Sequence, residues 1–293
     1  MTASPIHAGL VMVMASVFIA LSTFFAKGVA GRFEFMGESG IHPLQITAAR
    51  FIVAWCIWMI VILLRRRSFD TIHWPLHFMR TLFGWLTVTC LFWASSLMAL
   101  SDATAISFLT PVVTLILAAL FLGERVGWVR KSAVGIMLLG ALLLLRPGTS
   151  AFQPAALIAL VAAVASGFES MFIKKITALE RMLQILFINN SIGLVIAVFA
   201  AVWVWVWPTP MQWLFLVLVG FSMAAAQVFF LSSMKQGDAS FVVPFMYSTL
   251  IFAGILDFVV FGDAPDAWGA IGALIIVIGA IFLAWRESTK VKE

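Results

Sequence analysis

The chain consists almost entirely of long, continuously apolar runs joined by short polar segments. A helix needs roughly 20 apolar residues to cross the hydrocarbon core of a bilayer. Ten runs approach this length, and they predict ten membrane-spanning helices. The expected helices cover residues 7–30, 43–64, 74–99, 102–122, 128–145, 154–175, 182–207, 211–234, 238–261 and 267–285. Because the connections are short, no extramembrane domain is expected.

Composition excludes a soluble protein. Hydrophobic residues make up 63% of the chain and charged residues only 11%, whereas a soluble domain has about 25% charged residues. Strands of a transmembrane β-barrel alternate apolar and polar side chains, and these runs do not. The sequence therefore predicts an all-α membrane protein. Cys56 and Cys90 lie inside apolar runs, and we interpret them as packing residues.

The charges predict the orientation, because lysine and arginine concentrate in cytoplasmic segments. Ten spans place both termini on one side of the membrane. With a cytoplasmic N-terminus, Lys27, Arg32 and Arg146 fall outside and Arg50 lies within a span. The other fourteen lysines and arginines fall on the cytoplasmic side: Arg65, Arg66, Arg67, Arg80, Arg125, Arg130, Lys131, Lys174, Lys175, Arg181, Lys235, Arg286, Lys290 and Lys292. We therefore expect an inner-membrane protein with both termini cytoplasmic. This bias explains the net charge of +5 without a nucleic-acid partner.

Polar anchors recur along the chain and indicate an internal repeat. Ser95–Ser96 match Ser232–Ser233, and Gly140 matches Gly279 at a similar spacing. The basic loop GERVGWVRK corresponds to the acidic loop GDAPDAW. These matches predict two five-helix repeats, residues 1–148 and 149–293. An odd number of spans per repeat inverts one half relative to the other, in agreement with the opposite loop charges.

Inverted repeats are typical of secondary transporters, which bind substrate near the membrane midplane where the repeats meet and work by alternating access. The chain has no GxxxxGK[ST] phosphate loop for ATP. Nor does any Ser/His/Asp set converge on one site, so an enzyme is not expected. His73 and His77 are four residues apart, but no HExxH glutamate accompanies them. We expect these histidines on a solvated face, with neither metal nor cofactor.

Two segments resemble the paired EamA repeats of the drug/metabolite transporter superfamily. They are DATAISFLTPVVTLILAALFLGERVGWVRK, from Asp102, and GDASFVVPFMYSTLIFAGILDFVVFGDAPDAW, from Gly237. The resemblance implies ten helices around a central cavity and the transport of amino acids or other small metabolites. Members similar to the YddG exporters would move aromatic or other neutral amino acids. Other members would take up nucleotide-derived metabolites such as S-adenosylmethionine.

Neutral polar and aromatic side chains inside the spans predict where such a substrate binds. Trp85, Thr89 and Trp93 recur every four residues and share one helix face. Gln227 is the strong hydrogen-bonding group on a similar face of the eighth span, and Tyr247 is the only tyrosine. Contacts between helices explain any one of these residues equally well. The expected substrate-binding set is Ser22, Phe25, Trp85, Thr89, Trp93, Phe168, Glu169, Gln227 and Tyr247.

Ionisable residues within spans are costly and point to function. Glu169 suits a substrate amine or a coupled proton, with a local pair to Lys174 or Lys175 as the alternative. Arg50 suits a substrate carboxylate, although a structural contact with carbonyl groups explains it better. Pro111 and Pro244 lie within the fourth and ninth spans, where they act as hinges or as static kinks.

The sequence therefore predicts a secondary transporter of small metabolites. Export of aromatic or other neutral amino acids is the first expectation. The alternatives are uptake of a nucleotide-derived metabolite such as S-adenosylmethionine, or a lipid-handling membrane protein, for which Arg50 is the only deep cation. A channel is disfavoured because the spans contain no charged pore-lining ring.

Overall fold

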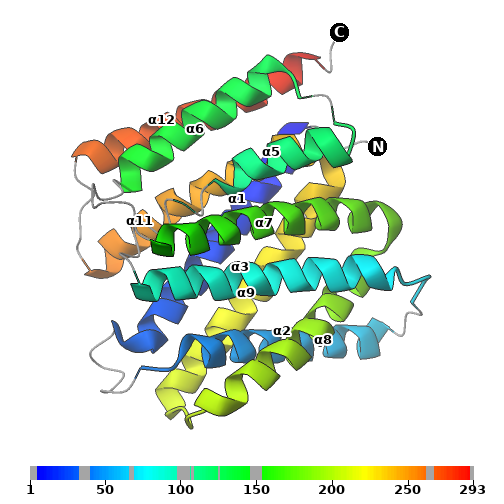
Figure 1. The fold of residues 1–293 in the computed structure, drawn as a ribbon, viewed down its shortest axis with the longest axis vertical. Helices are drawn as coiled ribbons and strands as arrows, with labels where there is room; N and C mark the ends of the chain where they lie inside the picture. Colours follow the sequence, from blue (N-terminus) through cyan, green and yellow to red (C-terminus); the bar gives the residue numbers. More distant parts are fainter. Residues whose placement is uncertain are drawn as a thin grey trace.

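The computed structural model describes residues 5–32, 40–65, 69–97, 106, 109–124, 126–145, 154–261 and 267–290. Every regular element in these ranges is a helix, which confirms the all-α class (Figure 1). The first half contains α1 (Pro5–Lys27) with a π-helical end (Gly28–Arg32), α2 (Pro43–Arg65), α3 (Trp74–Leu97), α5 (Thr110–Phe121) and α6 (Trp128–Leu145). The second half contains α7 (Pro154–Leu179), α8 (Met182–Ala201), the 3₁₀ turn η3 (Val202–Val204), α9 (Pro210–Gln236), α10 (Ala239–Val242), the 3₁₀ segment η4 (Val243–Tyr247), α11 (Ser248–Phe261) and α12 (Ala267–Lys290).

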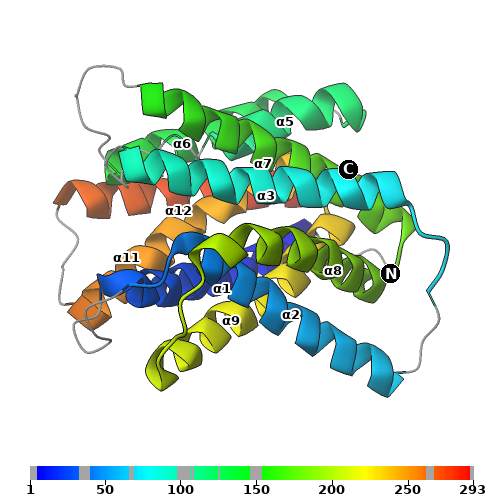
Figure 2. The same cartoon turned by 60° about the horizontal axis from the view of Figure 1, so that its bottom comes forward.

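The helices pack mainly as pairs that join the two halves of the chain. Helix α1 contacts α9, α3 contacts α7, α2 contacts α8, and α6 contacts α12. The α6–α12 pair forms one edge of the bundle and the α2–α8 pair the opposite edge (Figure 1). The start of α1 and the end of α12 lie toward the same end (Figures 1 and 2). Neither half therefore packs as a separate body.

Helices α6 and α12 approach closely where each presents a glycine to the other. A Cβ atom added to Gly140 would lie 2.8 Å from the carbonyl oxygen of Gly272. One added to Gly279 would lie 2.7 Å from Cγ of Met137. Small residues at such crossings allow helix backbones to pack closely within membranes. The two glycines thus make reciprocal contacts at one helix crossing.

Six helical segments in the described part of the chain are long and apolar enough to cross a membrane. They are Ile6–Ala30, Pro43–Arg65, Leu157–Leu179, Met182–Val204, Pro210–Gln236 and Ala239–Leu256. Large apolar side chains such as Val195 and Phe199 are 70% and 73% exposed. So much exposed apolar surface marks a face that contacts lipid rather than water.

The two prolines expected inside spans, Pro111 and Pro244, lie in different kinds of element. Pro111 lies in the first turn of α5, after the N-cap residue Leu109, where a helix does not use the missing N–H. In the described part of the fourth span Pro111 therefore lies near a helix start, and its role as a hinge stays a prediction. Pro244 lies in η4, which separates α10 from α11. The ninth span is thus interrupted by a 3₁₀ segment at its proline.

Candidate functional site

A cavity of about 180 Å³ lies among the helices that join the two halves. Residues of α1, α2, α3, α7, α8, α9 and η4 line it. Its polar lining residues are Arg50, Arg80, Thr81, Trp85, Thr87, Ser166, Glu169, Ser170, Asn189 and Gln227. Apolar side chains such as Ile19, Phe51 and Phe230 complete the wall. A mostly apolar pocket with a few convergent polar groups is the usual form of a small-molecule site.

Three charged side chains face this cavity from three helices. Arg50 comes from α2, Arg80 from α3 and Glu169 from α7. The charge of Glu169 interacts with those of both arginines. Lys174 does not take part, because its Nζ donates to the carbonyl oxygens of Met234 (2.8 Å) and Gly237. Glu169 thus shares the cavity wall with two arginines, and Lys174 bonds elsewhere.

Both arginines retain unused hydrogen-bond donors. Arg80 is 1% exposed, and its Nη1 donates to the carbonyl oxygen of Ile185 at 3.5 Å. The guanidinium of Arg50 lies 4.6 Å above the ring of Phe51. Among the described residues, the buried Nε atoms of both arginines have no hydrogen-bond partner. Buried donors are usually paired, so these two are available to an acceptor that enters the cavity.

Helix α3 holds the Glu169 carboxylate through close packing against α7. The ring of Phe83 stacks on those of Phe168 and Phe172, with centroids 5.1 and 5.7 Å apart. A Cβ atom on Gly84 would lie only 2.7 Å from Oε1 of Glu169. The missing side chain at Gly84 therefore provides the space that the carboxylate occupies.

Replacing Gly84 with alanine is expected to displace the Glu169 carboxylate. Overpacking of this kind costs about 1–3 kcal/mol, so we expect substrate affinity to fall about tenfold. The matched control is Gly135→Ala on α6, because a Cβ atom there meets no atom within 4 Å. Binding measured by competition in proteoliposomes compares the two variants. Equal affinities would show that Gly84 does not position the carboxylate.

Three residues of the sequence-predicted set line the cavity: Trp85, Glu169 and Gln227. The Oε1 atom of Gln227 accepts a hydrogen bond from Nδ2 of Asn190 at 2.9 Å. Among the other members, Ser22 donates to the carbonyl oxygen of Val219 at 3.1 Å.

The remaining members lie in helix contacts away from the cavity lining. Phe25 packs edge-on against Phe215, Phe168 stacks on Phe83, and Tyr247 is fully buried in the apolar core. Thr89 is partly buried on α3 outside the cavity lining. The side chain of Trp93 lies outside the described residues. The structure thus brings Trp85, Glu169 and Gln227 together at the cavity, but not Phe25, Phe168 or Tyr247.

The most informative residue that sequence reasoning misplaced is Arg80. Its position near the start of α3 suggested a cytoplasmic surface charge, yet the side chain is buried and lines the cavity. Asn189 on α8 also lines the cavity, and its Oδ1 accepts a hydrogen bond from Oγ1 of Thr81 at 3.0 Å. Arg80 and Gly84 are four residues apart and so share a helix face. This four-residue spacing from a glycine was the sequence signal that could have placed Arg80 on a packed helix face.

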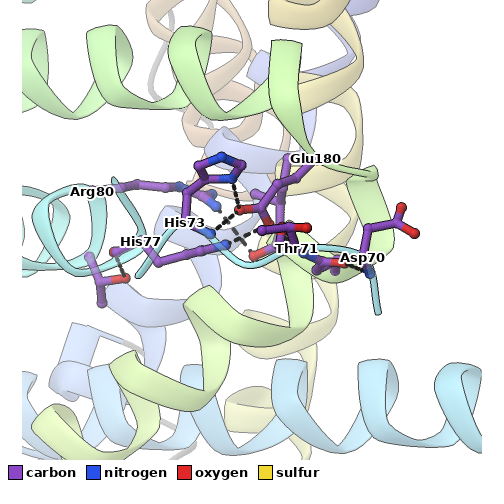
Figure 3. Close-up of polar contacts among 9 residues, drawn as sticks. Asp70, Thr71, His73, His77, Arg80 and Glu180 are labelled. Carbon is purple, nitrogen blue, oxygen red and sulfur yellow. Dashed lines mark hydrogen bonds and ion pairs between the residues drawn. The ribbon is translucent and has the colours of Figure 1, made fainter. Parts of the chain in front are cut away.

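His77 does not lie on a solvated face, which corrects the expectation for this residue, whereas the side chain of His73 is 40% exposed. His77 is fully buried, and its Nε2 lies 2.8 Å from Oε2 of Glu180 (Figure 3). Nδ1 of His73 lies 3.1 Å from Oε1 of the same carboxylate, which also accepts from the His73 backbone N–H. Glu180 follows α7 and was not considered beforehand. Among the residues with described positions, no three His, Cys, Asp or Glu side chains form a metal site.

The Glu180 carboxylate is held in its charged form by these donors. Burial by itself would raise its pKa, but the backbone N–H of His73 and the side chains of His77 and Gln184 outweigh that effect. The pKa of Glu180 therefore lies below its ordinary value. This carboxylate connects the start of α3 with the turn between α7 and α8.

A second polar cluster joins the halves near the start of α10. The carboxylate of Glu124 accepts hydrogen bonds from the backbone N–H groups of Ala239 (2.8 Å) and Ser240 (3.0 Å) and from the hydroxyl of Ser240. Arg130 donates to Oδ2 of Asp238 at 2.8 Å and to Oγ of Ser240 at 2.7 Å. A carboxylate at a helix N-terminus stabilises the unpaired N–H groups there.

Two glutamines bind the backbone of linking segments in the same way. Nε2 of Gln45 donates to the carbonyl oxygen of Val206 at 2.6 Å, and Oε1 accepts from the Val206 N–H at 3.0 Å. Oε1 of Gln184 accepts from the Asp70 N–H at 2.8 Å, and Nε2 donates to the carbonyl oxygen of Thr71 at 3.4 Å. Gln45 lies at the start of α2 and Gln184 at the start of α8, which are at opposite ends of the bundle (Figure 1). We call these contacts the Gln45 clamp and the Gln184 clamp.

Comparison with known proteins identifies the family and the fold. An S-adenosylmethionine uptake transporter of Rickettsia bellii (strain RML369-C) is 26% identical over 248 residues, or 84% of this chain and 85% of that protein. A pseudopaline exporter of Pseudomonas aeruginosa (strain UCBPP-PA14) is 26% identical over 213 residues, 72% of this chain and 75% of that protein. A riboflavin transporter of Rhizobium johnstonii (strain DSM 114642 / LMG 32736 / 3841) is 30% identical over 230 residues, 75% of this chain and 74% of that protein.

A solved crystal structure with 22% sequence identity superposes with a TM-score of 0.80 and covers 94% of this chain and 98% of that chain, which shows a shared fold. The model of the EamA-like transporter family matches residues 7–146 and 153–285. The resemblance to the EamA repeats is thereby confirmed. Because the match covers nearly the whole chain, this protein belongs to the EamA-like transporter family and is a small-molecule membrane transporter rather than an enzyme.

Proposed function

We propose that this chain is a secondary transporter that moves an amino-acid-type metabolite across the inner membrane. Transport proceeds by alternating access between two inverted repeats, residues 1–148 and 149–293, with ten spans and cytoplasmic termini. The observation that carries this proposal is the cavity between the halves, where Arg50, Arg80 and Glu169 meet. The arginines suit a substrate carboxylate, and Glu169 suits its ammonium group.

The helix contacts support inverted repeats because they persist when the two halves are exchanged. Under this exchange α1, α2, α3 and α6 correspond to α7, α8, α9 and α12. The α1–α9 contact then becomes α7–α3, and the α2–α9 contact becomes α8–α3; all four contacts occur. The α2–α8 and α6–α12 pairs map onto themselves, as pairs on a two-fold axis do.

Individual residues repeat in the same register. The tripeptide Leu-Gln-Ile contains Gln45 near the start of α2 and Gln184 near the start of α8, and each glutamine forms its clamp. The spacing between these glutamines equals that between Gly140 and Gly279, the reciprocal pair at the α6–α12 crossing. Two independent pairs with one spacing support a duplication, and the position of the two clamps at opposite ends supports its inversion.

The proteins similar to this chain transport several kinds of small molecule, which widens the class of substrates to be considered. Proteins similar to this chain are an S-adenosylmethionine uptake transporter, a pseudopaline exporter and a riboflavin transporter. S-adenosylmethionine contains an amino-acid group, so its uptake is the second candidate function. Export of aromatic or other neutral amino acids, as expected from the sequence, falls within the proposed class.

Reconstitution tests the proposal. Purified protein in liposomes loaded with unlabelled amino acids is expected to accumulate a labelled amino acid by counterflow, and an imposed pH gradient tests coupling through Glu169. S-adenosylmethionine and riboflavin are assayed in parallel. Failure to move any amino acid, with or without the gradient, would contradict the proposal. Movement of S-adenosylmethionine alone would favour the second candidate.

A further inference from the structure

The charges that line the cavity do not balance. In their ordinary ionised forms, the lining residues Arg50 and Arg80 contribute two positive charges and Glu169 one negative charge. The other lining residues that the structure describes carry no charge at neutral pH. One positive charge in the cavity therefore lacks a counter-ion among these residues.

An uncompensated charge within the membrane is expensive, and ionisable side chains there normally pair with one another. Each guanidinium offers five N–H donors in a planar fork that matches a carboxylate. In the described structure, Arg80 uses one long bond to Ile185, and Nε of each arginine has no partner. Charge and hydrogen bonding thus both leave room for a bound anion.

Neighbouring contacts hold the Glu169 carboxylate in place at the cavity wall. Gly84 provides the space for the carboxylate, and the stacked rings of Phe83, Phe168 and Phe172 fix α3 against α7 beside it. A neutral amino acid would add one carboxylate and one ammonium, so the excess positive charge would remain. A substrate with one additional carboxylate would neutralise it.

We propose that the cavity selects amino-acid-type substrates with net charge −1, which carry two carboxylates and one ammonium group. The two carboxylates bind Arg50 and Arg80, and the ammonium binds Glu169. Amide groups of Gln227 and Asn189 contact the rest of the molecule. This inference rests on the proposed function and narrows its substrate class, and it disfavours neutral amino acids and cationic metabolites.

Glutamate and glutamine form the matched probe pair, because they have the same shape and differ by one negative charge. In counterflow with wild-type protein in liposomes, glutamate is expected to compete against labelled aspartate at least tenfold better than glutamine does. Equal competition by the two compounds, or better competition by glutamine, would overturn the inference while leaving the proposed function intact. Absence of transport for every amino acid would instead contradict the proposed function.

A charge-removing variant provides the second measurement. Arg50→Gln leaves one arginine and Glu169 in balance, so the ratio of glutamate to glutamine competition is expected to fall at least tenfold, toward neutral substrates. Lys131→Gln is the control, because it removes one charge from an exposed residue at the start of α6. An unchanged ratio in folded Arg50→Gln protein would also overturn the inference. If Arg50→Gln does not fold, the comparison of glutamate with glutamine in the wild-type protein tests the inference by itself.

Discussion

Replacing Glu180 with alanine is expected to lower the free energy of unfolding by about 3–5 kcal/mol, the usual cost of removing one partner from a buried charged cluster. The variant would leave the buried His77 imidazole without its acceptor and would remove acceptors from His73 and Gln184. Thermal unfolding in detergent, followed by circular dichroism, measures the loss. Glu180→Gln, which keeps one acceptor oxygen, is expected to lose less.

Asp70→Ala is the matched control for this effect. Asp70 pairs with Arg181 at 2.8 Å in the same region, but both side chains are about half exposed, at 47% and 59%. An exposed ion pair contributes at most about 1 kcal/mol. If the two alanine variants unfolded at the same temperature, the Glu180 cluster would have no special structural role.

Acidification should reproduce part of the Glu180 effect in the unmodified protein. Because the folded-state pKa of Glu180 lies below its ordinary value, the charged carboxylate contributes stability above the unfolded-state pKa of about 4.3. That contribution is lost as the pH falls through the lower, folded-state pKa. The difference in stability between the wild type and Glu180→Gln is therefore expected to shrink below about pH 4. A difference that stays constant down to pH 2 would contradict this assignment.

The second large effect concerns the two glutamine clamps. Removing either one is expected to shift the equilibrium between the forms open at the two ends of the bundle, in opposite directions for the two clamps. Each clamp contains two hydrogen bonds to backbone, worth about 1 kcal/mol each. Gln45→Ala should therefore favour opening at the end where α2 starts by roughly 30-fold, and Gln184→Ala should favour opening at the other end. The double variant should return toward the wild-type balance, since both states lose a clamp.

Labelling of a cysteine in the cavity reads out this balance. Thr87→Cys is placed in a background with Cys56→Ser and Cys90→Ser, and an impermeant maleimide is added from either side of oriented vesicles. Gln236→Ala is the control, because Gln236 bonds only within α9, to Ser232, among the contacts described for it. Shifts in the same direction for both clamp variants would contradict alternation between inverted repeats.

Much of the helical framework follows from apolar run length alone. The predicted start at Pro43 and the predicted span from Trp128 to Leu145 agree with α2 and α6. Run length does not reveal breaks in the backbone, because the residues of η4 are as apolar as those of the helices beside it. The proline itself indicated a kink or hinge at Pro244, and the structure added that this break is a 3₁₀ segment.

The site was less predictable because its charges are paired across long sequence distances. Glu169 stood out as a carboxylate inside an apolar run, and it does line the cavity. Arg80 looked like a surface charge because it lies near a helix start, and only the packing of α3 against α7 shows that it is buried. His77 was misassigned for the same reason, since its partner Glu180 is more than a hundred residues away.

The reciprocal glycines at the α6–α12 crossing have a consequence for the energetics of transport. In the proposed inverted architecture this crossing maps onto itself, so its contacts are the same in the outward-facing and inward-facing forms. Whatever free energy it contributes then cancels from the equilibrium between those forms. A bulkier residue at Gly140 would weaken the protein as a whole without changing which way it faces. The α6–α12 crossing thus stabilises both forms equally. The preference for one form over the other must be set elsewhere in the bundle.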